Sequence, residues 1–263
     1  MARVGIIGVG AVGTAVLLGM EPYHEVSGYD IDGRGSFEDI LDTDAVLICV
    51  ATDGLSPGEL DMSAIEETVR HLDETDYSGL VIVKSTLQPG TMEKLETIYP
   101  ALRICYMPEF LRERDANEWF ASPDRLVVSG SPEVVAEALK LFEWIPAAVP
   151  RLTMTHLEAE LGKLAHNAFI ATKVTFTCEI ERISLHHGAD PLKVMEVVWQ
   201  DRRVCNPAHL TPGLGGFDGK CVPKDTRALS SADPNEDGLL AQVLRLGSAE
   251  AVETRMRGTV NRE

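Results

Sequence analysis

The stretch "RVGIIGVGAVGTAVLLGM", from Arg3 to Met20, places three glycines between two apolar runs. Gly8, Gly10 and Gly13 have the spacing G-x-G-x-x-G, which is typical of the turn between a β-strand and a helix where a dinucleotide binds. The first glycine permits the tight turn, the second lets a pyrophosphate approach the backbone, and the third lets the helix lie close to the sheet. The stretch therefore predicts the strand, turn and helix that open a Rossmann-like fold.

The next predicted strand supports the same site because it ends in a carboxylate. The run "HEVSGYD" ends at Asp30, near the usual distance of about 20 residues from the glycines. This carboxylate would accept hydrogen bonds from the adenosine ribose and would repel a 2′-phosphate. We therefore expect NAD rather than NADP as the cofactor, although Arg34 nearby leaves that preference open.

Apolar strand patterns alternate with helical ones until a point close to Thr155, after which the pattern is helical only. Runs such as "DAVLICVA", "GLVIVKS", "LRICYM", "RLVVSG" and "AAVPRL" are typical of a parallel sheet covered on both faces. We expect an α/β fold with a doubly wound, mainly parallel sheet in residues 1–152. An all-α domain with a long central helix should follow in residues 153–263.

The long helix is predicted over residues 155–187, between a capping box at Thr155 and Glu158 and a stop at Gly188. At 1.5 Å per residue it would be roughly 45–50 Å long, too long for one small domain to cover. We therefore expect a homodimer built on this helix. A glycine- and proline-rich loop is predicted over residues 205–225, and helix again after it.

Charge and cysteine content exclude several classes of function. The net charge of −17 repels phosphate backbones, so nucleic acid is not an expected partner. The five cysteines are scattered without paired spacing, which indicates neither a disulfide framework nor a metal site. No apolar run reaches the length of a membrane span, and the start of the chain does not resemble a signal peptide. A cytoplasmic protein is expected.

Five further stretches occur in a specific order: "VATDGLSPGELDMS", "VKSTLQPGT", "MPEFLRE", "ELGKLAHNAFIATK" and "GFDGKCVPKDTRAL". They resemble V-P-T-P before D-L-S, V-K-S-T-V-P-P-G-T, N-P-E-F-L-R-E, E-x-x-K-x-x-x-N-x-x-x-A-x-K and G-F-G-G-x-C-x-P-K-D-x-x-A-L. Taken together, they resemble the UDP-glucose/GDP-mannose 6-dehydrogenase family over nearly the whole chain.

The resemblance implies an NAD-dependent oxidation of a sugar C6 alcohol to a carboxylate in two successive hydride transfers. By resemblance, Cys221 captures the aldehyde as a thiohemiacetal and then carries the thioester that water hydrolyses. Lys163 and Asn167, at i and i+4 on one helical face, would donate hydrogen bonds to the oxyanion. Asp225 would orient water or take a proton, and Glu109 is a second proton-transfer candidate.

The remaining site residues follow from the same motifs. Thr86 is predicted to hydrogen-bond within the catalytic site. The expected cofactor-binding residues are Gly8, Gly10, Val12, Gly13, Asp30, Thr52, Ser85 and Thr86. The expected substrate-binding residues are Glu109, Phe110, Leu111, Glu113, Lys163, Asn167, Arg203 and Gly219. The implied substrate is a nucleotide sugar.

The sequence also departs from the family pattern. The chain resembles a short form without the C-terminal nucleotide-binding domain, and Asp218 replaces a glycine of the cysteine loop. Two alternatives therefore stay open. One is a two-electron dehydrogenase of the β-hydroxyacid type with a small substrate. The other is a non-catalytic NAD-binding partner subunit.

Overall fold

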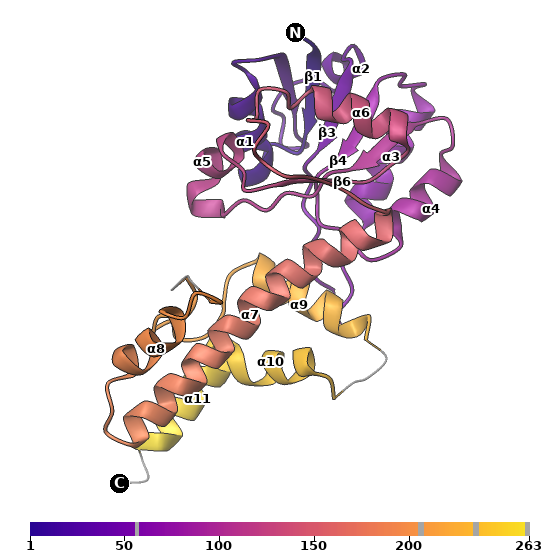
Figure 1. The fold of residues 1–263 in the computed structure, drawn as a ribbon. Coiled ribbons are helices and arrows are strands. Elements are labelled where there is room, and N and C mark those ends of the chain that lie inside the picture. The colour runs from indigo at the N-terminus through magenta and orange to yellow at the C-terminus, as the bar shows by residue number, and fades with distance from the viewer. Residues whose placement is uncertain (56–57, 205–207, 234–236, 261–263) are drawn as a thin grey trace. The chain divides into compact units, whose positions relative to one another are not determined.

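The computed structural model describes residues 1–55, 58–204, 208–233 and 237–260, with the side chains of Glu113 and of 255–260 left out. The chain forms two compact units (Figure 1). The first unit consists of Met1–Asp53 and Leu60–Lys163, and the second of Gly54–Glu59 and Leu164–Glu263. One long helix begins in the first unit and continues into the second.

A parallel sheet of five strands forms the centre of the first unit, in the order β2-β1-β3-β4-β5. The strands are β1 (Arg3–Ile7), β2 (Glu25–Tyr29), β3 (Ala45–Ile48), β4 (Leu80–Val83) and β5 (Arg103–Tyr106). The strand order reverses at β1, which pairs with β2 on one side and β3 on the other. The predicted Rossmann-like parallel sheet is confirmed.

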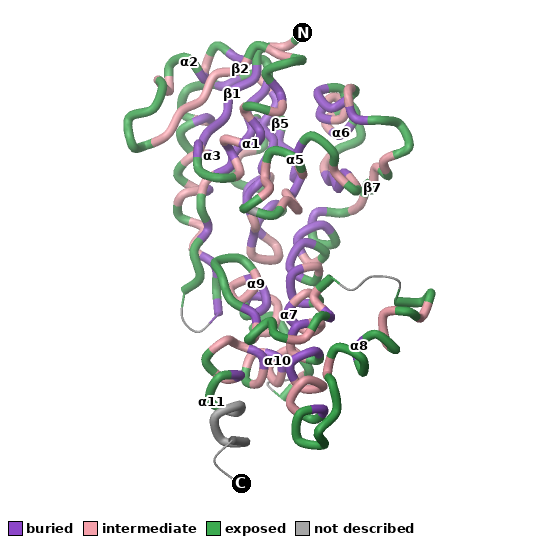
Figure 2. Tube along the Cα trace, turned by 90° about the vertical axis from the view of Figure 1, so that its left-hand side faces the viewer, coloured by how far each residue is buried: buried purple, intermediate pink, exposed green. Residues whose placement is uncertain are grey.

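Helices cover both faces of this sheet, which explains why the strand sequences are almost continuously apolar. They are α1 (Ala11–Met20), α2 (Phe37–Leu41), α3 (Ser63–Glu74), α4 (Thr91–Ile98), α5 (Ala116–Ala121) and α6 (Pro132–Lys140), with a short 3-10 turn at Glu113–Asp115. In β3, Leu47 packs into the core cluster beneath α1 and α6, whereas Val46 and Ile48 pack into the opposite cluster with α3 and α4. Figure 2 shows the central strands as largely buried.

The runs at β6 (Leu126–Val128) and β7 (Arg151–Thr153) form a separate two-stranded parallel sheet. Among the residues described, the backbone pairing that links them to the main sheet is an antiparallel bridge between Tyr106 and Ser129. Two backbone hydrogen bonds of 3.0 and 2.9 Å close that bridge. Apolar periodicity predicts such strands but does not fix which neighbour they pair with.

The second unit is helical, as expected. It contains most of α7 (His156–His186), together with α8 (Pro191–Trp199), α9 (Cys221–Ser231), α10 (Leu239–Gly247) and α11 (Ala249–Val260). The predicted capping box forms before α7: Thr155 N donates to Glu158 Oε2 at 2.8 Å, and Glu158 N donates to Thr155 Oγ1 at 3.3 Å. The loop predicted over 205–225 ends earlier than expected, since α9 begins at Cys221. Pro223 lies in the first turn of this helix, where proline is tolerated.

A small core holds the second unit together. Ala171, Val174 and Cys178 on α7 pack with Phe217 before α9 and Val243 on α10. Phe217 is fixed further because its N–H donates to the Gly247 carbonyl at 2.8 Å. Within the described ranges, no helix is both long enough and apolar enough to cross a bilayer.

One buried carboxylate ties the start of α7 to the first unit's fold. Glu160 on α7 is fully buried, and its two oxygens accept hydrogen bonds from Gly90 N at 2.6 Å and Met92 N at 2.8 Å. These donors lie at the N-terminus of α4, where backbone N–H groups lack helical partners and favour negative charge. Burial raises the pKa of Glu160 despite the two backbone donors.

We predict that Glu160→Ala lowers the free energy of unfolding by about 2–4 kcal/mol, because it leaves one buried and one partly buried backbone donor without an acceptor. Chemical denaturation at neutral pH measures this change. Glu143→Ala, at an exposed position beyond α6, is the matched control and should stay within about 0.5 kcal/mol of the original chain. Equal stability of the two variants would contradict the capping role of Glu160.

Candidate functional site

The predicted residues of the first unit gather at one edge of the sheet. Each follows the carboxyl end of a parallel strand, where open α/β sheets bind ligands. Gly8 follows β1, Asp30 follows β2, Thr52 follows β3, Ser85 and Thr86 follow β4, and Glu109, Phe110 and Leu111 follow β5. The reversal of strand order between β1 and β3 marks the crevice of this edge.

The glycines of the first turn are required by close approaches of the backbone. Gly8 has φ +87°, and a Cβ there would lie 2.8 Å from the Cys49 carbonyl carbon and the Val50 nitrogen. A Cβ at Gly13 would lie 1.9 Å from the Gly8 oxygen, so α1 can pack here only without a side chain. At Gly10, in contrast, a Cβ would have no heavy atom within 4 Å. The helix N-terminus is therefore open to an anionic group at Gly10, and Val12 lies in the first turn of α1.

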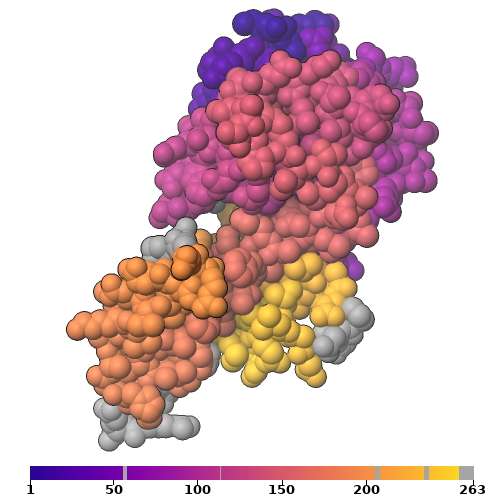
Figure 3. Space-filling view, in the orientation of Figure 1, coloured from indigo at the N-terminus to yellow at the C-terminus, as the bar shows by residue number. Residues whose placement is uncertain are grey.

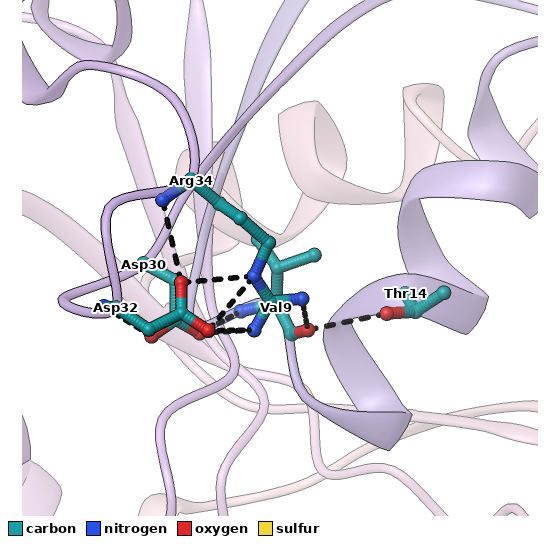
Figure 4. Close-up of polar contacts among 5 residues, drawn as sticks. All are labelled: Val9, Thr14, Asp30, Asp32 and Arg34. Carbon is teal, nitrogen blue, oxygen red and sulfur yellow. Dashed lines mark hydrogen bonds and ion pairs between the residues drawn. The ribbon is translucent and has the colours of Figure 1, made fainter.

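Asp30 and Arg34 both hold the peptide groups of Val9 in this turn (Figure 4). Val9 N donates to Asp30 Oδ2 at 2.7 Å, and Arg34 Nη1 donates to Val9 O at 2.5 Å. Arg34 also pairs with Asp32 at 2.7 Å, and its hydrogen bond lowers the pKa of Asp32. The guanidinium charge is thus already compensated by carboxylates, which favours NAD over a cofactor carrying a 2′-phosphate.

A buried ion pair lies beside the strand ends. Lys84 Nζ is 3.1 Å from Glu109 Oε2 and donates to the Met107 carbonyl at 3.1 Å. The Lys84 side chain is only 3% exposed and the Glu109 side chain 15%. A cavity of about 20 Å³ borders both residues, which is room for about one water molecule. The Glu109 carboxylate is therefore held by a fixed cation at the edge of the sheet.

Phe110 joins this pair to the predicted oxyanion donor Lys163. Phe110 N donates to Glu109 Oε1 at 2.9 Å. Its ring lies under the Arg125 guanidinium, 4.1 Å from the centroid, and under Lys163 Nζ, 5.1 Å from the centroid. Lys163 is buried, and the Phe110 ring is one of the groups that its ammonium contacts.

In the second unit, Asn167 on α7 and Asp225 on α9 lie in contact, although they are 58 residues apart in sequence. Asn167 Nδ2 donates to Asp225 Oδ2 at 2.5 Å. The other oxygen, Asp225 Oδ1, accepts a hydrogen bond from Lys224 Nζ at 2.6 Å. Asp225 is fully buried and Asn167 nearly so. We call Asn167, Lys224 and Asp225 the carboxylate cluster.

Cys221 lies on α9 with Lys224 and Asp225 of the carboxylate cluster, one turn before Asp225, and is exposed. An ammonium that pointed toward the sulfur would favour the thiolate, but the Lys224 ammonium contacts Asp225 instead. The loop before Cys221 contains Gly216, whose φ of +96° and close approach to Ala249 allow no side chain. The cysteine is therefore carried by a fixed helix and an anchored loop.

Burial separates Cys221 from the other cysteines that the structure describes. Burial raises the pKa of Cys49 and of Cys105 to about 12, so both are inert thiols at neutral pH. Cys178 is also buried, within the core of the second unit. Cys221 is therefore the exposed nucleophile candidate among the described residues.

Three other predicted substrate residues are Arg203, Gly219 and Glu113. Arg203 is 86% exposed and pairs with Asp201 at 2.5 Å. Gly219 is exposed, two residues before Cys221. The side chain of Glu113 lies outside the described residues. Lys84 and Lys224 were not among the predicted site residues. The motifs "VKST" and "PKD" could have indicated them, because each lysine directly precedes a predicted site residue.

Comparison with known proteins identifies relatives of both units. The model of the UDP-glucose/GDP-mannose dehydrogenase family, NAD binding domain, matches residues 35–145. The model of the central domain of the same family matches residues 157–248.

The similar curated proteins include UDP-glucose 6-dehydrogenase AglM of Haloferax volcanii, which is 32% identical over 81% of this chain and 56% of its own length. GDP-mannose 6-dehydrogenase of Pseudomonas aeruginosa is 32% identical over 73% of this chain and 47% of its own. The structure of a UDP-glucose dehydrogenase from Pyrobaculum islandicum is 28% identical, with a TM-score of 0.82, and matches 100% of this chain and 69% of that one. The chain spans about half the length of the curated relatives it matches.

We predict that Lys84→Met lowers the free energy of unfolding by about 3–5 kcal/mol, because it leaves the Glu109 carboxylate with no cation in a largely buried position. Thermal or chemical unfolding measures the loss. Lys140→Met, on the exposed end of α6, is the control and should have a small effect. The double variant Lys84→Met/Glu109→Gln should recover part of the loss, and a Lys84→Met chain as stable as the control would contradict the ion pair.

Proposed function

The chain belongs to the UDP-glucose/GDP-mannose dehydrogenase family, and we propose that it oxidises the primary alcohol of a nucleotide sugar to a carboxylate, with NAD as the oxidant. The observation that supports this most strongly is the carboxylate cluster, which fixes the helix that begins with Cys221. The balanced reaction converts one alcohol, one water and two NAD⁺ into one carboxylate, two NADH and three protons.

The first unit has the features that fit NAD. The open helix N-terminus at Gly10 would receive the pyrophosphate, and Asp30 would accept hydrogen bonds from the ribose. Thr52, Ser85 and Thr86 follow the neighbouring strand ends. When bound, NAD supplies the acceptor for each hydride.

The first oxidation turns the alcohol into an aldehyde, and a base must remove the hydroxyl proton. Lys163 and Asn167 would stabilise the alkoxide as the proton leaves, because both present N–H donors one turn apart on α7. Lys163 is placed by the Phe110 ring and Asn167 by Asp225. Both donors are therefore held before substrate binds, which is the arrangement that lowers a reaction barrier.

The second oxidation uses Cys221 as a covalent nucleophile. Its sulfur adds to the aldehyde carbon to give a thiohemiacetal, and loss of the second hydride and of the hydroxyl proton leaves a thioester. Water then adds to the thioester carbonyl and the thiolate departs, which releases the carboxylate. Asp225 or Glu109 would take the proton of that water, since each is a carboxylate held beside a lysine.

We predict that the chain forms two NADH per molecule of substrate with a UDP- or GDP-linked hexose. Cys221→Ser should reduce this toward one NADH and lower the overall rate by about a thousandfold or more, because the aldehyde has no thiol to capture it. Absorbance of NADH and product analysis measure both quantities. Cys178→Ser, at a buried position of α7, is the matched control and should still form two NADH.

Three outcomes would contradict the proposed function. Full conversion to carboxylate by Cys221→Ser at the original rate would remove the covalent role, and a yield of one NADH from the unaltered chain would favour a two-electron dehydrogenase. NAD binding without turnover on the whole panel of nucleotide sugars would favour a non-catalytic partner subunit.

We also propose that the chain is a homodimer built on α7. Phe169, Phe176 and Ile183 are 64%, 46% and 41% exposed, and their seven-residue spacing puts them on one side of the helix. On α8, Val197 is 77% exposed. The end of α7 and α8 form one continuous surface, coloured orange in Figure 3. Exposed apolar side chains in such a row are typical of a protein interface.

We predict that Phe176→Asp raises the dissociation constant of the dimer at least about 30-fold, because it places a charge in the apolar row. Analytical ultracentrifugation at micromolar concentration measures the change. Leu239→Asp, at the exposed first residue of α10, places the same charge on a different helix and should leave the mass unchanged. A monomeric unaltered chain at this concentration would contradict the proposed dimer.

A further inference from the structure

His166 has no role in the reaction as described, but it contacts the carboxylate cluster. The residue precedes Asn167 on α7 and is partly buried. Its ring nitrogen Nδ1 lies 3.0 Å from Asn167 Oδ1, which is hydrogen-bonding distance. The ring therefore contacts the oxygen of the Asn167 amide, whereas Asp225 contacts its nitrogen.

The orientation of the Asn167 amide follows from the charges around it. Asp225 is fully buried and paired with the Lys224 ammonium, and an ionised carboxylate only accepts hydrogen bonds. The Asn167 amide must therefore present its NH₂ group to Asp225, as the 2.5 Å contact of Nδ2 requires. The amide oxygen is then the atom that faces His166.

The amide oxygen in turn decides which nitrogen of His166 carries hydrogen. A carbonyl oxygen only accepts, so the contact at Nδ1 needs a proton on Nδ1. In the neutral ring this leaves the lone pair on Nε2, since a neutral imidazole has one N–H. The cluster thus selects the Nδ1–H tautomer of His166.

We propose that His166 is a positioning residue for the oxidation: its Nδ1–H holds the Asn167 amide in the orientation that directs the NH₂ group to Asp225. Four side chains then form one ordered row, from His166 through Asn167 and Asp225 to Lys224. Without the ring donor, the amide loses one of the two contacts that fix its orientation. The effect on catalysis rests on the proposed function, whereas the tautomer does not.

The tautomer is tested without any substrate. In ¹⁵N-labelled protein, long-range proton–nitrogen NMR distinguishes a protonated from an unprotonated ring nitrogen, and loss of the signals in His166→Asn assigns them. The expected result is hydrogen on Nδ1, and a change in the protonation of that nitrogen in Asn167→Ala. A His166 ring protonated on Nε2 alone, or one unaffected by Asn167→Ala, would overturn the proposal. The exposed His187 serves as the reference ring.

Turnover tests the positioning role. His166→Leu has no donor and should lower kcat about five- to tenfold with an unchanged KM for NAD, the effect of one lost hydrogen bond. His166→Asn keeps an N–H donor close to the position of Nδ1 and should restore most of the rate. Equal losses in both variants, at equal melting temperature, would overturn the role. If the chain turns over no nucleotide sugar, this result contradicts only the proposed function. The NMR measurement still tests the proposed tautomer of His166.

Discussion

The packing of α9 against α7 in the second unit depends on one buried carboxylate. Asp225 is fully buried, and an isolated charge in that position would cost several kcal/mol. Lys224 supplies the opposite charge from the same helix, and Asn167 supplies a neutral donor from α7. Only a chain with α9 seated against α7 satisfies Asp225, so the same contact sets where Cys221, one turn earlier, is placed.

The first unit uses buried charge in the same way. Glu109 forms an ion pair with Lys84. Lys84 Nζ in turn lies 5.9 and 5.7 Å from the ring centroids of Phe120 and Phe142. Glu160 is held by the backbone donors of α4. In each case a largely buried carboxylate has a fixed partner, so the fold sets its orientation.

The sequence predicts those features that depend on neighbours along the chain. The turn at Gly8 and Gly13, the capping box at Thr155 and the length of α7 are local, so spacing and periodicity reveal them. The partners of Lys84 and Lys224 could not be predicted in this way. A lysine in a motif has many possible contacts, and only the fold decides which carboxylate it meets.

The start of α9 is a further instance. Glycine and proline content indicated a loop through Asp225, yet the helix begins at Cys221 because Pro223 fits its first turn and Asp225 needs a partner on α7. A tertiary contact here overrides the local composition. The thiol is consequently presented from a helix N-terminus, where backbone N–H groups favour nearby negative charge.

The central claim is that Cys221 forms a covalent bond with the oxidised substrate. The most direct measurement is peptide mass spectrometry of the Glu109→Gln and Asp225→Asn chains, each quenched in acid during turnover with NAD and a nucleotide sugar. The variant that lacks the proton acceptor should hydrolyse the thioester slowly. An acyl adduct of the nucleotide sugar is expected on the peptide that contains Cys221. Carboxylate formation with an adduct on another residue, or with none at any quench time, would contradict it.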